Sequence, residues 1–204
     1  MINKFSKPHL FLGKKAPEIP LSEISSKNIK TIYQKMLKIA YGEQKNRQKP
    51  IMVGLAAPQI GIFKRIILVD VKTNGKGKIG DLRIYINPEI IWASKKEGEW
   101  YEGCYSLPEV CGIVSRSTSV KVRAYTLKTP GIASVLPPRW DMVEEKHSDY
   151  VARIFQHEID HLDGKFFVER IKNPDHLHHV KKEEFPLYRD LQAWRNWPKK
   201  YPLP

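Results

Sequence analysis

The sequence predicts one domain of the α+β class, with two helices and several short strands. Two segments, 25–41 and 149–162, place apolar residues at helical spacing, whereas the region 62–126 consists of short runs rich in β-branched and aromatic residues. No internal repeat and no linker divides the 204 residues, and 41% of them are hydrophobic. A chain of this length and composition can bury one sizeable core. Few long helices beside several short strands are typical of the α+β class.

The helix predicted over 25–41 follows two serines, Ser25 and Ser26, whose hydroxyls can accept hydrogen bonds from its first backbone amides. Its apolar positions recur at spacings of three and four residues: Ile29, Ile32, Tyr33, Met36, Leu37 and Ala40. Gly42 and the polar stretch up to Pro50 end the helix. The apolar stripe is explained most simply by packing in the core.

Three strands are predicted between the two helices, over Ile62–Val71, Arg83–Ile86 and Ser119–Tyr125. The charged segment KTNGKGKIGD between the first two contains glycines, which favours a turn or loop. Residues 127–142 contain three prolines and a glycine, so we expect a loop or an irregular insertion there.

The second helix is predicted from about Asp149 to Leu162, because Ser148 can cap its start and Gly164 can end it. KFFV at 165–168 has the composition of a further strand. The two helices therefore flank the β-rich region.

Charge and cysteine content limit the classes of function. The chain has 35 Lys and Arg against 22 Asp and Glu, a formal net charge of +13. Because the lysines are scattered and no nucleic-acid motif accompanies them, we expect weak affinity for polyanions and no specific nucleic-acid partner. No apolar run approaches the roughly 18 residues of a membrane span, and the apolar run at the N-terminus is too short for a signal peptide. Two cysteines are too few for a disulfide framework, so we expect a cytoplasmic protein with reduced thiols and no membrane partner.

The segment HEIDH, residues 157–161, indicates a metal site. On a helix, His157 and His161 lie one turn apart on the same face, so both imidazoles can bind one ion at about 2.0–2.1 Å. Glu158 can reach a water on that ion without binding the ion itself, which is the HExxH arrangement of metal hydrolases. The alternative is a solvated helix with incidental histidines. The residues around the motif are largely apolar, however, and a buried helix does not carry such polar groups without partners.

The third ligand of this site is less obvious. HExxH most often belongs to a zinc peptidase whose third ligand lies downstream. The downstream candidates are poor, because Glu169 follows the predicted strand and the histidines of 176–179 fall in a segment with surface composition. Upstream, Cys104 in YEGCYSLPEV could provide a thiolate, and one cysteine with two histidines leaves a fourth position open, as in catalytic sites. A lone cysteine is also commonly a small buried apolar residue.

The segment GLAAPQIG, residues 54–61, surrounds one polar side chain, Gln59, with small residues. It could be a tight turn before the strand predicted at Ile62. Alternatively, the small residues admit a substrate backbone while the Gln59 amide donates a hydrogen bond to a developing oxyanion.

GLAAPQ, EGCYS and HEIDH, in this order, resemble the three signature motifs of the peptide deformylase family. The segments PHLFLGKKAPEI, INPEI and ARIFQHEIDHLDGKFFVERI are also similar to that family, so the resemblance covers most of residues 8–171. It implies short, mostly antiparallel strands in small sheets, packed around a central helix that carries HEIDH, plus an N-terminal helix. It also implies a metal-dependent hydrolase that removes the formyl group from the N-terminal formyl-methionine of new polypeptides and releases formate.

The resemblance also assigns the metal site. Matched motif by motif, Cys104, His157 and His161 would be the metal ligands and Glu158 the general acid and base. The metal would be one divalent ion, Fe²⁺ in the cell, and Zn²⁺, Ni²⁺ or Co²⁺ can also occupy such a site.

The substrate side of the site follows from the same match. Gln59 and the backbone N–H of Tyr105 would bind the oxyanion, and Gly54 would lie along the substrate backbone. Glu102 and Arg116 would orient the ligands.

Two positions depart from the family pattern. The first motif normally begins with glycine where this chain has Met52, and the second has leucine where this chain has Tyr105. Because only the backbone of residue 105 is needed for the oxyanion, we expect the tyrosine ring to affect substrate entry and preference more than the metal site. Cys111 is expected to be a free thiol without an assigned role.

Two rival functions remain compatible with the residues. One is a relative that keeps the metal but only binds a partner, which the intact Cys104, Glu158 and Gln59 argue against. The other is a metallopeptidase that cleaves ordinary amides, which a cysteine ligand and the missing downstream ligand argue against.

The last part of the chain is expected to differ from the catalytic domain in composition. We expect a catalytic domain over 1–171 and a basic, aromatic tail over 172–204 that packs on the same domain or extends from it. Segment 181–197 could form an amphipathic helix, but Pro186 argues against one continuous run. We expect a monomer that acts on formyl-methionyl nascent peptides, and the basic tail suggests association with the ribosome.

Overall fold

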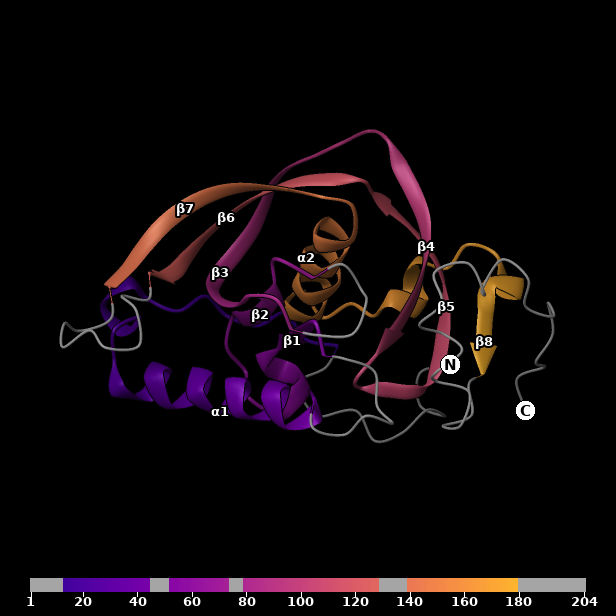
Figure 1. Cartoon of the computed structure of the whole chain (residues 1–204). Coiled ribbons are helices and arrows are strands. Elements are labelled where there is room, and N and C mark those ends of the chain that lie inside the picture. Colours follow the sequence, from indigo (N-terminus) through magenta and orange to yellow (C-terminus); the bar gives the residue numbers. More distant parts are fainter. Residues whose placement is uncertain (1–12, 45–51, 74–78, 129–138, 180–204) are drawn as a thin grey trace.

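The part of the chain that the structure describes folds into an α+β structure with antiparallel strands in two sheets and two α-helices, as the sequence predicts (Figure 1). The structure, a computed structural model, describes residues 13–44, 52–73, 79–128 and 139–179. Within these residues, no helix combines the length and the apolarity needed to cross a bilayer.

The larger sheet has five strands in the order β1-β2-β3-β6-β7, and every neighbouring pair is antiparallel. Its strands are β1 (Gly54–Ala56), β2 (Ile66–Asp70), β3 (Leu82–Ala93), β6 (Ser119–Lys128) and β7 (Arg139–Ser148). All five residues of β2 are buried, which explains its unbroken apolar sequence IILV. β3 contains two shifts of register against β6, and near the first of them the Asn87 side chain bonds both the backbone N–H and the carbonyl of Ile19, at 2.9 and 2.8 Å. The segment before α1 is thereby fixed to this sheet.

The smaller sheet contains three antiparallel strands in the order β4-β5-β8. They are β4 (Glu97–Cys104), β5 (Leu107–Ser117) and β8 (Leu177–His179). β4 and β5 form a hairpin whose connection consists of Tyr105 and Ser106 only. The register shifts between Gly103 and Cys104, so that Cys104 faces Leu107 directly before the turn. This irregularity places Cys104 at the end of its strand.

Helix α2 (Asp149–Leu162) packs against strands of both sheets, namely β1, β2, β3, β6 and β7 of the larger sheet and β5 of the smaller (Figure 1). It begins and ends at the residues that the sequence predicts. Ser148 bonds Ser119 at 3.0 Å instead of capping the helix amides. Gly164 has φ 74°, and a Cβ at this position would come within 2.9 Å of the backbone of Gly13 and Lys14. Glycine is therefore required where the chain turns away from α2.

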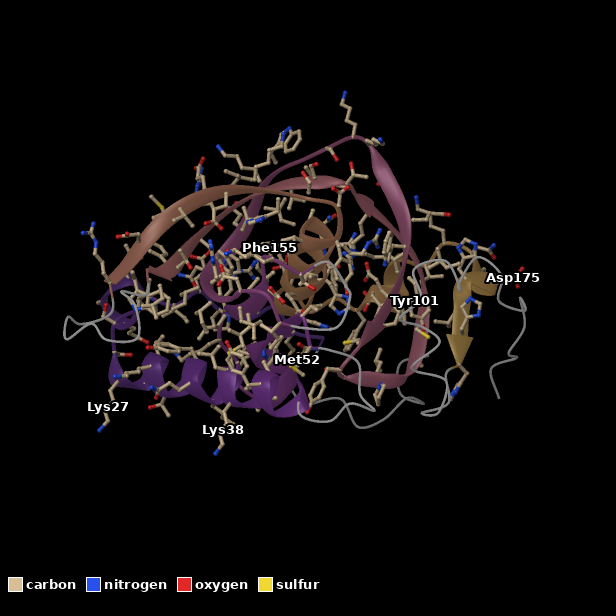
Figure 2. All side chains as sticks on the ribbon, viewed as in Figure 1. Lys27, Lys38, Met52, Tyr101, Phe155 and Asp175 are labelled. Atoms are coloured by element: carbon tan, nitrogen blue, oxygen red, sulfur yellow. The ribbon has the colours of Figure 1, made fainter. Side chains whose placement is uncertain are left out.

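Helix α1 (Lys27–Gln44) lies against β1 and β2 through its apolar face. The Ser26 hydroxyl accepts a hydrogen bond from the Ile29 amide at 3.3 Å, so the predicted N-cap is confirmed. Lys27 and Lys38 point away from the core, as Figure 2 shows. α1 thus covers the part of the sheet from which GLAAPQ emerges.

Two local predictions of strand are wrong. Residues 62–65 precede β2 without joining it. Residues 165–168 are not a strand, because η4, a 3₁₀-helix over Phe167–Arg170, begins in the middle of them. Glu169 closes this turn: its amide bonds the Phe166 carbonyl at 3.0 Å, and its carboxylate accepts the Phe166 amide at 3.1 Å. Phe166 and Phe167 are buried beside Cys104, which explains their apolar character.

Strands also occur in two segments where the sequence did not predict them: at both ends of 127–142 and near the start of the tail. β6 extends to Lys128 and β7 begins at Arg139, so strands occupy both ends of the segment predicted as irregular; the residues between lie outside the described part. β8 pairs with β5, and the remaining tail from 180, including the amphipathic segment 181–197, also lies outside the described part. Three further 3₁₀-helices complete the described elements: η2 (Leu21–Glu23), η3 (Ala57–Ile60) and η5 (Pro174–His176).

Candidate metal centre

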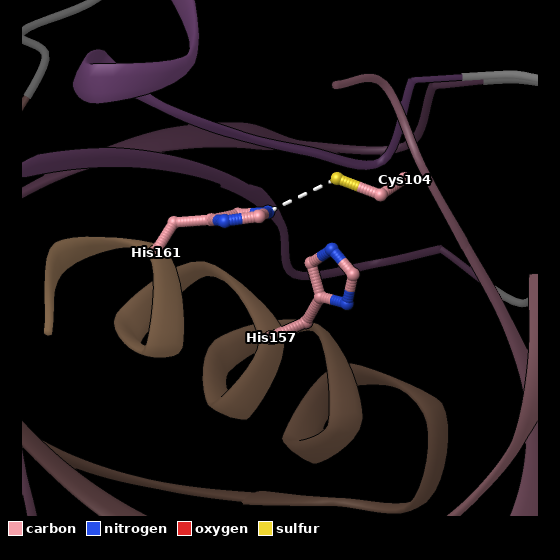
Figure 3. Close-up of side chains that lie close together, drawn as sticks. All are labelled: Cys104, His157 and His161. Carbon is pink, nitrogen blue, oxygen red and sulfur yellow. Dashed lines mark hydrogen bonds between the residues drawn. The ribbon is translucent and has the colours of Figure 1, made fainter. Parts of the chain in front are cut away.

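Two elements bring three metal-binding side chains to one point. His157 and His161 project from the same side of α2 toward Cys104 at the end of β4 (Figure 3). One ligand atom from each of the three residues lies within 4.8 Å of the others, and the Cys104 Sγ is 3.1 Å from the His161 Nε2. Residues 53 positions apart in sequence therefore form one buried group that could hold a metal ion.

The Cys104 sulfur lies in a setting that favours the thiolate. Its Sγ accepts hydrogen bonds from the Ser106 amide and the Gln59 side chain, both at 3.4 Å. Burial alone would raise the pKa of the thiol, but the charge of His161 and hydrogen bonds with His157 and His161 hold that pKa well below its usual range. A thiolate is the form in which cysteine binds metals.

His157 is oriented through its second ring nitrogen. Its Nδ1 lies 2.9 Å from the Glu102 carboxylate. An ionised carboxylate can only accept hydrogen bonds, so Nδ1 carries a proton and Nε2 is the nitrogen left to bind a metal. A histidine ligand held by a carboxylate is the common arrangement in metal sites.

Glu102 is held by two arginines as well as by His157. Arg116 donates to both of its oxygens, at 2.6 and 2.9 Å, and Arg153 donates to Oε1 at 2.7 Å. Burial alone would raise the pKa of Glu102, but the charge of Arg116 and the hydrogen bond from His157 hold it well below its usual range. Arg116 also donates to Asp160 at 2.7 Å, and Arg170 pairs with the same carboxylate. The result is a buried network of charges that continues from the strands into α2.

Gln59 is presented by the first turn of η3, which follows β1 directly. Its Oε1 accepts a hydrogen bond from the Ala56 amide at 2.7 Å, which fixes the orientation of the side-chain amide. The NH₂ group therefore faces the three candidate ligands, 3.4 Å from the Cys104 sulfur and 3.2 Å from the His161 Nε2. It is a donor directed into the space beside the candidate ligands, where a developing oxyanion could accept its hydrogen bond.

Glu158 lies beside His157 on α2 but in the opposite electrostatic setting to Glu102. It is buried, and its Oε2 has no hydrogen-bond partner among the described residues. Burial raises the pKa of Glu158 to about 7, although the charges of His157 and His161 oppose that rise. A carboxyl group that gains and loses a proton near neutral pH is suited to general acid–base catalysis.

Gly54 in β1 makes room for this carboxyl group. A Cβ at position 54 would overlap the Glu158 Oε1 and come within 2.8 Å of the Ile154 side chain. The glycine that opens GLAAPQ is thus explained by close approach to the acid–base candidate.

The chemistry of the donor set fits a divalent metal. One thiolate and two imidazoles are three ligands of the kind found in catalytic sites with an open fourth position. The proton that Glu102 holds on His157 leaves the correct nitrogen facing Cys104.

The two residues that depart from the family pattern lie in different settings. Tyr105 occupies the turn next to Cys104, and its side chain is 47% exposed. Met52 is buried in the cluster between α1 and the larger sheet. Tyr105 is therefore placed at the solvent side of the site, whereas Met52 is a core residue.

Sequence reasoning missed Arg153 and Asp160. Both belong to the buried face of α2 and both pair with residues of the network around Glu102 and Arg116. Their signal was present in the sequence, because a charged residue on an otherwise apolar helix, four positions before His157, requires a buried partner.

Comparisons with known proteins agree with the motifs. The sequence model of the family described as polypeptide deformylase matches residues 2–176. A peptide deformylase of Lachnoclostridium phytofermentans is 42% identical over 124 residues, which are 61% of this chain and 66% of that protein. One of Thermotoga neapolitana is 42% identical over 120 residues, 59% of this chain and 62% of that protein, so the chain matches just under two thirds of the length of these relatives. The crystal structure of peptide deformylase from Thermotoga maritima has a TM-score of 0.63 and 30% identity, covering 83% of this chain and 98% of that one.

Proposed function

The chain belongs to the peptide deformylase family, and we propose that it removes the formyl group from the N-terminal formyl-methionine of newly synthesised polypeptides. The observation that carries this proposal is the meeting of three separate motifs at one point: Cys104 with both histidines of HEIDH, and Gln59 of GLAAPQ directed at them. A metal ligand set, a buried acid–base carboxyl group and an oriented amide donor are the parts that hydrolysis of an amide needs.

We assign Cys104, His157 and His161 as the ligands of one divalent metal. Fe²⁺ is the ion that we propose for the cell, with Zn²⁺, Ni²⁺ or Co²⁺ as substitutes, because a thiolate beside two imidazoles suits soft and redox-active ions. When bound, the metal would lower the pKa of water and polarise the formyl carbonyl.

The side chains of the protein then perform the proton transfers. Glu158 takes a proton from the attacking water, whose oxygen bonds to the formyl carbon. The oxygen of the former carbonyl becomes negative and accepts hydrogen bonds from the Gln59 amide and the Tyr105 backbone N–H. Glu158 returns the proton to the amine nitrogen as the C–N bond breaks, which releases formate and a free N-terminus. Gly54 would lie along the substrate backbone while admitting Glu158 beside it.

The cellular setting is part of the same proposal. The substrates would be nascent chains in the cytoplasm, the enzyme would act as a monomer, and its positive charge would favour association with the RNA-rich surface of the ribosome. Cosedimentation with ribosomes, measured with and without residues 172–204, tests the contribution of the tail: loss of binding on deletion supports it, and unchanged binding contradicts it.

The activity is tested by purifying the protein without oxygen, loading it with Fe²⁺ or Ni²⁺, and measuring formate released from a short formyl-methionyl peptide. We expect release by the wild type and not by Glu158→Ala. Binding of the peptide without release would favour a binding protein, and cleavage of an internal bond in an unformylated peptide would favour a metallopeptidase. Either result would overturn the proposal.

A further inference from the structure

Arg153 is a buried cation on the helix that carries both candidate histidine ligands. It lies one turn before His157 on α2 and is only 7% exposed. Burying a guanidinium group is costly unless its N–H groups find acceptors, so its partners show what it is placed to do.

All the described partners of Arg153 belong to the β4–β5 hairpin. Its Nη1 donates to the Glu102 Oε1 at 2.7 Å and to the Val114 carbonyl at 2.9 Å, and its Nη2 donates to the Gly98 carbonyl at 2.6 Å. Gly98 and Glu102 lie on β4 and Val114 on β5. One side chain of α2 therefore bonds both strands of the hairpin.

The candidate metal ligands are divided between these same two elements. His157 and His161 are on α2, whereas Cys104 ends β4, so the metal centre forms only if hairpin and helix keep their relative position. Arg153 spans that boundary. Within the site it also holds one oxygen of Glu102, the carboxylate whose other oxygen orients the His157 ring.

We propose that Arg153 is a positioning residue of the metal centre, which fixes Glu102 and the hairpin against α2 so that His157 and Cys104 face one ion. The inference rests on the proposed metal site but extends it to a residue outside the three motifs. Arg116 reaches Glu102 from β5, within the hairpin, and links the hairpin to α2 through Asp160. Arg153 makes a different link, because it joins α2 to Glu102 itself and to the backbone of both strands.

A matched control exists at the other end of α2. Arg65 is also 7% exposed and also bonds one carboxylate and two carbonyls, those of Asp163, Leu162 and Pro88. It ties the end of α2 to the larger sheet without contacting a residue that orients a ligand. A variant at Arg65 therefore shows what the loss of a buried arginine does to stability alone.

The test uses the full-length chain loaded with Co²⁺, with Arg153→Met, Arg153→Lys and Arg65→Met. The rate at which a chelator removes the metal and the absorption spectrum of bound cobalt are measured beside thermal unfolding. We expect Arg153→Met to lower cobalt affinity by roughly 10- to 100-fold and to change the spectrum. Arg153→Lys should recover part of this loss because it keeps the charge. Arg65→Met should lower the unfolding temperature but leave affinity and spectrum close to wild type.

A second pair of variants tests whether Arg153 acts through Glu102. In a Glu102→Gln background, adding Arg153→Met should weaken cobalt binding much less than it does in the wild type. Equal cobalt release from Arg153→Met and Arg65→Met at similar stability, or additive effects of Arg153→Met and Glu102→Gln, would overturn the proposal. A wild type that binds no cobalt would instead refute the metal centre itself, so the two failures are distinguishable.

Discussion

Glu102 and Glu158 are two glutamates on either side of His157, and they differ in their hydrogen-bond partners and in the direction in which their pKa is shifted. Their burial is nearly equal, at 6% and 5% exposure. Glu102 accepts hydrogen bonds from two arginines and from His157, and its pKa lies well below the usual range. Glu158 leaves its Oε2 without a partner among the described residues, and burial raises its pKa to about 7. Burial alone therefore does not decide what a carboxyl group does.

The difference comes from the elements that each glutamate faces. Glu102 lies on β4 between α2 and β5, where Arg116, Arg153 and His157 all donate hydrogen bonds to it. Glu158 faces β1, where Gly54 has no side chain that could form a hydrogen bond with the carboxyl group. The first setting keeps a fixed negative charge that orients a ligand, and the second keeps a group that can exchange a proton. The predictions below test this difference in role between the two glutamates.

Apart from the two glutamates themselves, the largest effect is expected from Gln59, the donor on the same side as Glu158. Gln59→Ala should lower formate release by about 10²–10³-fold, because a directed hydrogen bond to the developing oxyanion is lost. Gln156→Ala is the control, since that glutamine bonds the Ser117 and Ala152 carbonyls on another side of α2. Steady-state assays with a formyl-methionyl peptide compare the two. Similar losses in both would show that Gln59 has no special role.

Filling the space beside Glu158 should have the next largest effect. Gly54→Ala places a methyl group where the carboxyl group lies, so we expect roughly a 10²-fold fall in formate release with little change in metal affinity. Gly103→Ala is adjacent to Cys104, but its nearest contact would be an ordinary 3.8 Å, so it should stay near wild type. If Gly54→Ala is as active as Gly103→Ala, the close approach does not matter for catalysis.

The two glutamates should also affect stability in opposite directions with pH. The folded state of the metal-free protein binds a proton on Glu158 more tightly than the unfolded chain does, so this group's contribution to the free energy of unfolding falls as pH rises from about 4.5 to about 7. Glu102 has the reverse sign: its contribution is complete above the unfolded pKa and is lost as pH falls toward the lower folded value.

Urea unfolding of the metal-free wild type and Glu158→Gln at pH 5 and pH 7.5 isolates the first effect. Glutamine does not titrate, so the free energy of unfolding of the variant minus that of the wild type should rise by about 1–3 kcal/mol from pH 5 to pH 7.5. The same difference at both pH values would mean that Glu158 does not titrate in this range.

The smallest effect is expected at Tyr105. Only its backbone N–H is proposed to act, and about half of the residue is exposed to solvent. Tyr105→Leu should therefore change KM for different formyl peptides by less than about tenfold and leave kcat nearly constant, since a contact made equally in ground and transition state alters binding alone. A large loss of kcat for every peptide would show that the ring takes part in catalysis.

How far the sequence predicts this arrangement depends on how local each signal is. The bounds of α2 follow from its own apolar spacing and from Gly164, and the prediction is confirmed. The hairpin Glu97–Ser117 was not predicted, because its buried Glu102 and Arg116 resemble loop residues until their partners are known. Ion pairs between elements distant in sequence leave no local pattern. The motifs name the groups that we propose take part in the reaction, whereas the partners of Arg153 and Asp160 emerge only from the folded chain.

The division between the two glutamates is tested most directly by measuring cobalt affinity and formate release at saturating metal in Glu102→Gln and Glu158→Gln. We predict that each variant loses a different property. Glu102→Gln should bind cobalt roughly 10- to 100-fold more weakly yet keep much of its turnover once loaded. Glu158→Gln should bind cobalt as the wild type does and lose about 10²–10⁴-fold in turnover. Loss of the same property to the same extent in both variants would contradict the account.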